Sequence, residues 1–202
     1  ISVGSGFAYG PLGVSHHATE DISIMRAIPN ILTCSPCDPN ETKTLASLLS
    51  RYDGPAYIRI NKNGEPIITS SNKPFKIGHI SKLLSGEKAA IFGTGAIIGS
   101  TLHDAKKMNY SVYSFPFLNS INDKNLIQII SKYEKIITIE ENQLCGGFGS
   151  MILEKINDYK NKKLIRPDIT INRVGIEDQF ITFSGTQDYL RDRAGLTIKH
   201  LL

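Results

Sequence analysis

The sequence predicts an α/β protein built in two parts, in which short strands alternate with helices. Three observations predict this class. Runs rich in β-branched residues recur between amphipathic stretches, a polar segment over 61–74 interrupts the alternation once, and no run approaches the ~18 apolar residues of a membrane-spanning helix. The 202 residues are 41% hydrophobic and 21% charged, which suffices for a sizeable core and excludes a disordered or fibrous chain.

In the first part of the chain, residues 1–60, the sequence predicts about three strands and two helices. This is the content of the second half of an α/β domain. Its clearest element is a helix over 39–52: Asp38 caps it, Pro39 occupies its first position and Glu41 follows three residues after the cap. The other expected elements are strands over 1–4, 31–34 and 56–60 and a helix over 18–28.

The second part predicts a complete small domain. Segment 61–74 has little periodicity and is interpreted as a linker. After it, strands alternate with amphipathic helices, which predicts a mostly parallel, three-layer α/β/α domain over 75–202 that follows a half-domain over 1–60. The strands are expected over 89–92, 111–115, 136–139 and 169–174, and the helices over 96–108, 123–133, 147–159 and 187–193.

Charge and cysteine content narrow the function classes. The net charge is +4 and mixed along the chain, without the basic stripe of a nucleic-acid-binding protein. Cys34, Cys37 and Cys145 are too few for a disulfide framework and are typical of a reducing cytoplasm. Because the chain opens at Ile1, inside an expected strand, we expect a segment to precede it.

A glycine-rich loop before the helix over 18–28 is the densest candidate site. Four glycines and a proline precede His16 and His17, and such backbone allows close approach of a ligand. At a helix N-terminus the dipole attracts anions and opposes imidazolium, so a neutral histidine there can accept or relay a proton. Alternatively, one histidine caps the helix and the other is a buried hydrogen-bonding residue. Glu20 and Asp21 are expected to complement the helix dipole.

Arg59 is a second candidate, because it lies at the end of a strand. The carboxyl ends of parallel strands face the binding crevice of an α/β sheet, and a guanidinium there suits a phosphate or a carboxylate. The alternative is a surface salt bridge.

Three further clusters are expected to be structural. The run from Phe92 to Gly99 lacks the acidic ribose partner of a dinucleotide site, so it predicts a tight strand-to-helix turn. The run from Gly146 to Gly149 predicts a helix start, and Glu140 and Glu141 before it could approach the site of a partner subunit. The Cys34-x-x-Cys37 pair lacks the second half of a zinc pattern, and no metal site is predicted.

Several motifs, in order, resemble the transketolase family over nearly the whole chain, and they are similar to stand-alone C-terminal transketolase subunits and to 1-deoxy-D-xylulose-5-phosphate synthases. The first four match the last part of that family's pyrimidine-binding domain, and the others match its C-terminal domain. The motifs are YGPLGVSHHATEDI (9–22), MRAIPN (25–30), PCDP (36–39) with Glu41, GPAYIR (54–59), IEEN (139–142) and GGFG (146–149).

This resemblance implies a transferase that uses thiamine diphosphate and Mg²⁺ to move a two-carbon ketol unit between sugar phosphates. It implies that Ser15 and His16 match the family's Thr/Ser-His, that His17 replaces a residue that is often glutamine, and that Arg59 binds the substrate phosphate. We therefore take His16 and His17 as catalytic candidates and Ser15 and Arg59 as substrate-binding candidates. Where the family usually has Asp-Gly-Pro, this chain has Leu12-Gly13-Val14, which leaves the sugar open.

The resemblance also implies what lies outside these residues. The Gly-Asp-Gly motif and downstream asparagine that bind diphosphate and Mg²⁺ are absent, and the glutamate that contacts the aminopyrimidine would precede Ile1, so no cofactor-binding residue is assigned. We expect a diphosphate-binding domain or subunit as partner, a homodimer or heterotetramer, and no activity without them. The alternatives are a keto acid/aldehyde condensation like that of 1-deoxy-D-xylulose-5-phosphate synthase, and a non-catalytic assembly or nucleotide-binding module.

Overall fold

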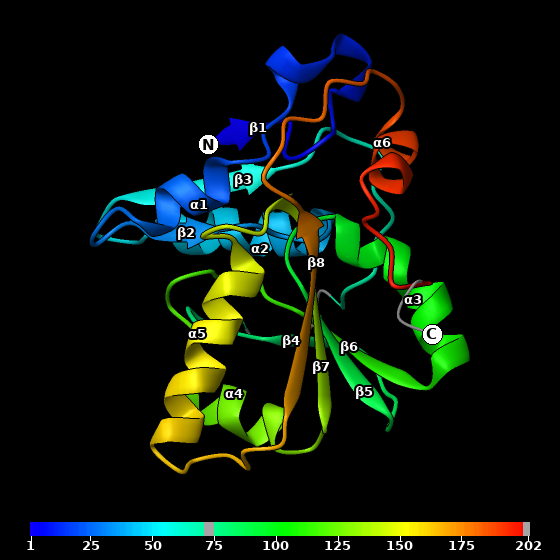
Figure 1. The fold of residues 1–202 in the computed structure, drawn as a ribbon. Coiled ribbons are helices and arrows are strands. Elements are labelled where there is room, and N and C mark those ends of the chain that lie inside the picture. Colours follow the sequence, from blue (N-terminus) through cyan, green and yellow to red (C-terminus); the bar gives the residue numbers. More distant parts are fainter. Residues whose placement is uncertain (71–74, 200–202) are drawn as a thin grey trace.

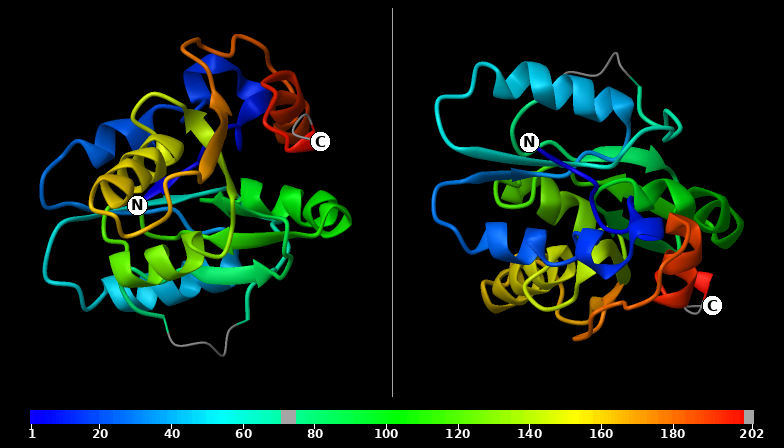
Figure 2. Two further views of the ribbon diagram at one scale, coloured as in Figure 1. Left: turned by 60° about the horizontal axis from the view of Figure 1, so that its bottom comes forward. Right: turned by 90° about the horizontal axis from the view of Figure 1, so that it is seen from above.

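Two β-sheets organise the chain in the computed structural model, which describes residues 1–70 and 75–199 (Figure 1). The smaller sheet has the strand order β1-β3-β2, with all strands parallel. Helices α1 and α2 cover its opposite faces, as Figure 2 shows from above. These elements are β1 (Ser2–Val3), α1 (Asp21–Arg26), β2 (Leu32–Cys34), α2 (Pro39–Leu49) and β3 (Ala56–Ile60).

Local sequence signals predict the start of one helix of this part correctly, but not the start of the other. Helix α2 begins as predicted, because the Asp38 side chain accepts the Glu41 N–H at 2.8 Å. Helix α1 is shorter than the predicted helix over 18–28. Ala18 instead exchanges two backbone hydrogen bonds with Gly6, at 2.9 and 3.0 Å, and this long-range pairing delays the start of α1 to Asp21.

The larger sheet has the order β4-β6-β5-β7-β8, and all its neighbouring strands are parallel except the β4–β6 pair. Figure 1 shows α4 and α5 on one face and α3 on the other, so the predicted three-layer, mostly parallel arrangement is confirmed. The edge strand β4 was not predicted. The elements are β4 (Ser81–Leu84), β5 (Ala89–Gly93), α3 (Ile97–Met108), β6 (Tyr110–Ser114), α4 (Asp123–Ile130), β7 (Lys135–Gln143), α5 (Phe148–Asn161), β8 (Thr170–Ile176) and α6 (Gln187–Arg193).

Successive side chains of the central strand β5 point to opposite faces of the sheet, so this strand contributes to both halves of the core. Phe92 packs on Phe115 in the cluster that includes Phe148 of α5, whereas its neighbour Ile91 lies in the cluster that includes Ile97 of α3. A strand buried on both faces is what a parallel sheet between two helical layers requires. Among the described residues, no helix has the length and apolar character needed to cross a bilayer.

The two sheets are joined by backbone hydrogen bonds beyond the chain connection. Ser35 N–H donates to Pro116 O, and Leu118 N–H donates to Thr33 O, each at 2.9 Å. The described part of segment 61–74 is also packed, because the Asp38 carboxylate accepts the N–H groups of Ile68 and Thr69 at 2.8 and 2.7 Å. Residues 71–74 lie outside the described residues, and the division into 1–60, 61–74 and 75–202 stays a prediction.

Candidate functional site

The glycine-rich loop over residues 4–18 is named the histidine loop, because it carries His16 and His17. It is closed at its base by the Gly6–Ala18 pair and contains two short 3₁₀ helices, Gly10–Leu12 and Val14–His16. Two of its glycines are required by the fold. Gly4 has φ +98°, and a Cβ there would lie 2.4 Å from the Tyr9 ring. Gly6 has φ +55°, and its Cβ would lie 2.6 Å from the Glu141 side chain. The loop is therefore folded tightly and is held against the C-terminal part.

The two histidines of the loop lie in different environments. His16 is exposed, and its Nδ1 lies 3.1 Å from Ser15 Oγ. His17 is half-buried, with its ring edge-on to Phe7 at 5.1 Å between centroids. Both ring nitrogens of His17 are covered by protein, yet neither has a hydrogen-bond partner among the described residues. Buried polar groups without a hydrogen-bond partner are uncommon in folded proteins.

The predicted position of these histidines at a helix N-terminus is wrong. His16 ends a 3₁₀ helix and His17 follows it, whereas α1 begins only at Asp21 with Glu20 as its N-cap residue. The helix dipole therefore does not act directly on either imidazole. The glycine loop, and not a helix end, sets where the two rings lie.

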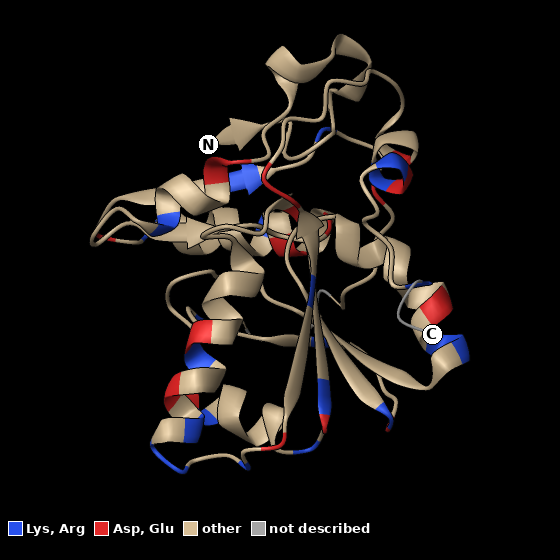
Figure 3. Ribbon diagram, in the orientation of Figure 1, with Lys and Arg blue, Asp and Glu red and all other residues tan. Residues whose placement is uncertain are grey.

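The loop that carries the exposed His16 has exposed apolar side chains and no charged ones. Figure 3 shows that the loop carries no charged residue, and Leu12 and Val14 are 60% and 43% exposed. The segment between β8 and α6 lies beside the loop, where Gly185 N–H donates to Gly10 O at 3.2 Å, and it adds Phe180, 71% exposed. Ser15 and His16 are thus exposed on a loop that also exposes apolar side chains.

Arg59 does not lie in an open crevice, which contradicts the expected surroundings of this residue. Its side chain is 2% exposed, and its Nε donates to the Asp21 carboxylate at 2.8 Å. Its Nη2 donates to the carbonyl oxygens of Ala18 and Glu141 at 2.7 and 2.8 Å. Tyr57 O–H donates to the same Asp21 oxygen at 2.8 Å. Arg59 therefore ties the base of the histidine loop to the C-terminal part, and Asp21 does more than complement a helix dipole.

Glu140 and Glu141 are both buried and have partners within the chain, so the idea that they reach a partner subunit is not supported by their surroundings. Glu140 accepts the N–H groups of Phe148 and Gly149 at 2.7 Å each and thereby caps α5. Burial raises the pKa of Glu140 to about 7, although these N–H donors oppose the shift. The sequence signal for this role is a glutamate placed shortly before the glycine-rich start of a helix.

The raised pKa of Glu140 predicts a pH-dependent stability. Because the folded state holds the proton more tightly than the unfolded state, the free energy of unfolding should fall as pH rises from about 4.5 to about 7, by up to about 3 kcal/mol. In urea unfolding, the wild type should lose stability relative to Glu140→Gln as pH rises across this range, because glutamine does not titrate. The exposed Glu177→Gln is the control, and a stability difference that is constant with pH would contradict the assignment.

The glycines after β5 form a packed turn, as predicted. Gly95 N–H donates to Ser35 O at 3.1 Å, and Thr94 O–H donates to Phe115 O at 2.8 Å. Cys34 and Cys37 are buried, and burial raises the pKa of Cys34 to about 12. In residues 1–70 and 75–199, no group of three or more His, Cys, Asp or Glu side chains is arranged to hold a metal ion.

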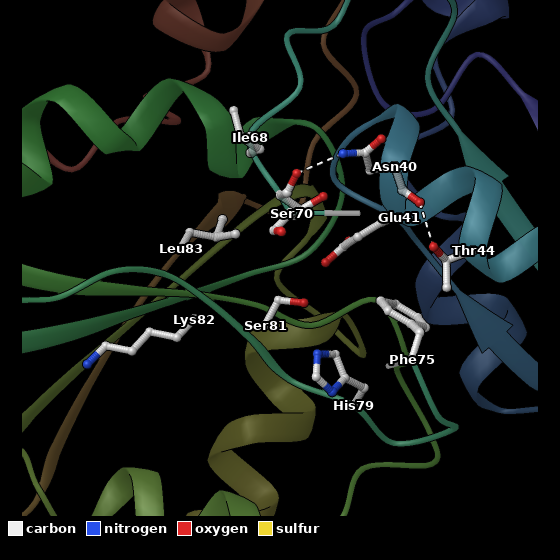
Figure 4. Close-up of a pocket in the computed structure, with 11 residues that line it drawn as sticks. Asn40, Glu41, Thr44, Ile68, Ser70, Phe75, His79, Ser81, Lys82 and Leu83 are labelled. Carbon is white, nitrogen blue, oxygen red and sulfur yellow. Dashed lines mark hydrogen bonds between the residues drawn. The ribbon is translucent and has the colours of Figure 1, made fainter. Parts of the chain in front are cut away.

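A cavity of about 210 Å³ lies away from the histidine loop, between α2 and β4 (Figure 4). Glu41 and Ser81 are on facing walls, with His79 and Phe75 nearby. The Glu41 carboxylate accepts Cys37 N–H at 2.9 Å and Ser114 O–H at 3.1 Å through Oε2, and burial raises its pKa. Because Glu41 belongs to α2 and Ser114 to β6, this hydrogen bond connects the first part of the chain to the second beside the cavity.

The fold and the loop together define a class: an α/β protein in two parts, with two mostly parallel sheets and a glycine-rich loop that carries two histidines. Family comparisons identify the two parts in order. Residues 1–65 match "Transketolase, pyrimidine binding domain", and residues 78–201 match "Transketolase, C-terminal domain". The chain belongs to the transketolase family, whose members are thiamine-diphosphate enzymes.

Individual relatives agree with this assignment. A 1-deoxy-D-xylulose-5-phosphate synthase of Caldanaerobacter subterraneus subsp. tengcongensis is 35% identical, over 85% of this chain and 28% of the relative. One subunit of an apulose-4-phosphate transketolase of Actinobacillus succinogenes is 29% identical, over 97% of this chain and 63% of the relative. A solved split-gene transketolase, described as an inactive β4 tetramer, has a TM-score of 0.79 at 25% identity and covers 97% of this chain and 60% of its own. The chain thus spans less than two thirds of each of these proteins.

Proposed function

We propose that this chain supplies the C-terminal section of a thiamine-diphosphate-dependent transferase that moves a two-carbon ketol unit between sugar phosphates. The ordered match to both family domains is the observation that supports this most. When bound, the cofactor supplies the electron sink for the carbanion chemistry, while protein groups orient the substrate and move protons. In this proposal the cytoplasm is the site of action, in keeping with the sparse, free cysteines.

The histidine loop is the part of this chain that meets the substrate in the proposal. His16 is exposed and would exchange protons with the donor's hydroxyl and carbonyl groups, with Ser15 fixing its ring through Nδ1. His17 would complete its hydrogen bonds with substrate or with the partner surface. A substrate-phosphate role for Arg59 requires that its remaining donor, Nη1, reach the site, since Nε and Nη2 are already engaged.

The diphosphate and Mg²⁺ are assigned to another segment. The described residues offer no cluster of side chains that could hold the ion. We propose a diphosphate-binding domain or subunit as the partner, in a homodimer or heterotetramer. The exposed apolar side chains of Leu12 and Val14 support a polypeptide partner at the histidine loop.

Thermal unfolding tests whether cofactor binding requires the diphosphate-binding section. Thiamine diphosphate with Mg²⁺ should leave the melting temperature of the chain alone nearly unchanged. With the diphosphate-binding section added, ligand at about 100 times Kd should stabilise the complex by about 2.7 kcal/mol, because only the assembled state binds it. Mg²⁺ alone is the control. A large upward shift with the isolated chain would contradict the proposal.

Condensation of a keto acid with an aldehyde is the second candidate reaction. Two observations favour it: the 35% identity to a 1-deoxy-D-xylulose-5-phosphate synthase, and Leu12-Gly13-Val14 in place of the Asp-Gly-Pro usual in transketolases. Assays of the complete enzyme with ketose phosphates and with pyruvate distinguish the two reactions.

A further inference from the structure

We propose that Glu141, on β7 of the C-terminal part, is a positioning residue that sets the orientation of His17 in the histidine loop. This inference rests on the proposed function, because it assigns the C-terminal part a task at the same site. It follows from a continuous series of contacts that begins at a buried carboxylate and ends at an imidazole.

The Glu141 side chain is the point at which three segments converge. It is 2% exposed, and its carboxylate accepts the Phe7 N–H of the histidine loop at 3.1 Å. It also accepts a hydrogen bond from Gln187 Nε2 at 3.0 Å and pairs with Arg191 Nη2 at 2.9 Å. A buried carboxylate with a charged partner and several donors holds a well-defined geometry. Helix α6 therefore fixes Glu141, and Glu141 fixes the backbone of Phe7.

Phe7 in turn contacts the His17 ring and limits its orientation. The Phe7 side chain is fully buried, so its ring has little freedom once its backbone is held. The ring meets the imidazole edge-on, with 5.1 Å between centroids and planes at 82°. Since neither imidazole nitrogen has a hydrogen-bond partner among the described residues, this aromatic contact is what orients the ring.

The other end of the loop depends on the same residue through its main chain. Arg59 Nη2 bridges the carbonyl oxygen of Ala18, next to His17, and the carbonyl oxygen of Glu141. Gly6 approaches the Glu141 side chain so closely that a Cβ would lie 2.6 Å from its Cδ. Both ends of the loop are thus held by Glu141, one through its carboxylate and one through its carbonyl. A change in the carboxylate should move the loop and leave the distant core in place.

The experiment compares Glu141→Gln with Asp188→Asn. Asp188 pairs with the same Arg191 at 3.3 Å but is 90% exposed and does not touch the loop, which makes it a matched control. The readouts on the whole chain are hydrogen exchange of the amides of residues 6–18 and the ring resonances and titration of His17 by NMR. For Glu141→Gln we expect about tenfold faster exchange in the loop and altered His17 ring signals, with unchanged exchange in α3 and α5. Asp188→Asn should match the wild type in both.

Three results would overturn the inference: an unchanged loop in a folded Glu141→Gln chain, exchange that rises equally throughout the chain, or equal effects of the two variants. If Glu141→Gln does not fold, Phe7→Leu tests the next contact, since it keeps the backbone N–H but removes the aromatic edge. His17 signals that do not change in Phe7→Leu would overturn the inference as well.

In the complete enzyme, Glu141→Gln should lower kcat while leaving KM nearly unchanged, because it misplaces a reacting group without removing a substrate contact. The two proposals fail separately. An assembled enzyme without thiamine-diphosphate-dependent activity, but with a loop that responds to Glu141→Gln, overturns the proposed function alone. An active enzyme with an unresponsive loop overturns the positioning role alone.

Discussion

Replacing His16 with alanine should lower kcat/KM of the complete enzyme by about 10²- to 10⁴-fold, the range for loss of a general acid or base. The imidazole is exposed on the loop, and its Nδ1 is engaged with Ser15 Oγ at 3.1 Å, which leaves Nε2 for the substrate. Because the side chain contributes little to the core, the melting temperature should change little. Steady-state kinetics and thermal unfolding on the same preparation separate the two effects.

His103→Ala is the matched control for this prediction. His103 is also an exposed histidine, but it lies on α3, on the far side of the larger sheet from α5. Its replacement should leave both kcat/KM and stability unchanged. If His16→Ala retains full activity in the assembled enzyme, the histidine is not a catalytic residue and the proposed role of the loop fails.

Replacing Arg59 with methionine should destabilise the protein by about 3 kcal/mol or more, the usual cost of removing one partner of a buried ion pair. The change leaves the Asp21 carboxylate, only 17% exposed, without its cation. It also removes the guanidinium donor from the carbonyl oxygens of Ala18 and Glu141, of which Ala18 O keeps the Gly6 N–H. Urea unfolding measures this loss. A second substitution, Asp21→Asn, should recover part of it, because it removes the uncompensated charge.

Arg51→Met is the control, since Arg51 is an exposed arginine at the end of α2. A stability change for Arg59→Met as small as that for Arg51→Met would refute the structural role. Kinetics of the same variant test the phosphate role independently. A raised KM for phosphorylated sugars in the folded variant would support it, and an unchanged KM would remove Arg59 from the substrate site.

Much of the fold was predictable, because many of its elements carry local signals. Helix α2 has an Asp-Pro start with a glutamate three residues after the cap, and this start is found where the sequence places it. The strands β3 and β5 are short runs of β-branched and apolar residues between turn signals. The edge strand β4 was missed because Ser81–Leu84 is half polar, short and only partly buried, so it has no strong periodicity.

The residues of the candidate site could be proposed from the sequence, but their geometry could not. Glycines mark the loop, yet the start of α1 depends on a pairing between Gly6 and Ala18 that no local pattern reveals. The predicted surroundings of Arg59 were wrong for a similar reason, since its ion-pair partner Asp21 lies 38 residues earlier in the chain. Glu141 is separated from Phe7 by 134 residues, and only the folded chain brings the two together.

The backbone hydrogen bonds between β2 and the segment after β6 have a mechanical consequence. Because Thr33 and Ser35 are bonded to Leu118 and Pro116, the two sheets cannot swing apart without breaking main-chain pairs in a buried region. The boundary between the two family domains is therefore not a hinge. In the proposed enzyme, substrate should therefore enter through movement of surface loops and not through separation of the two sheets.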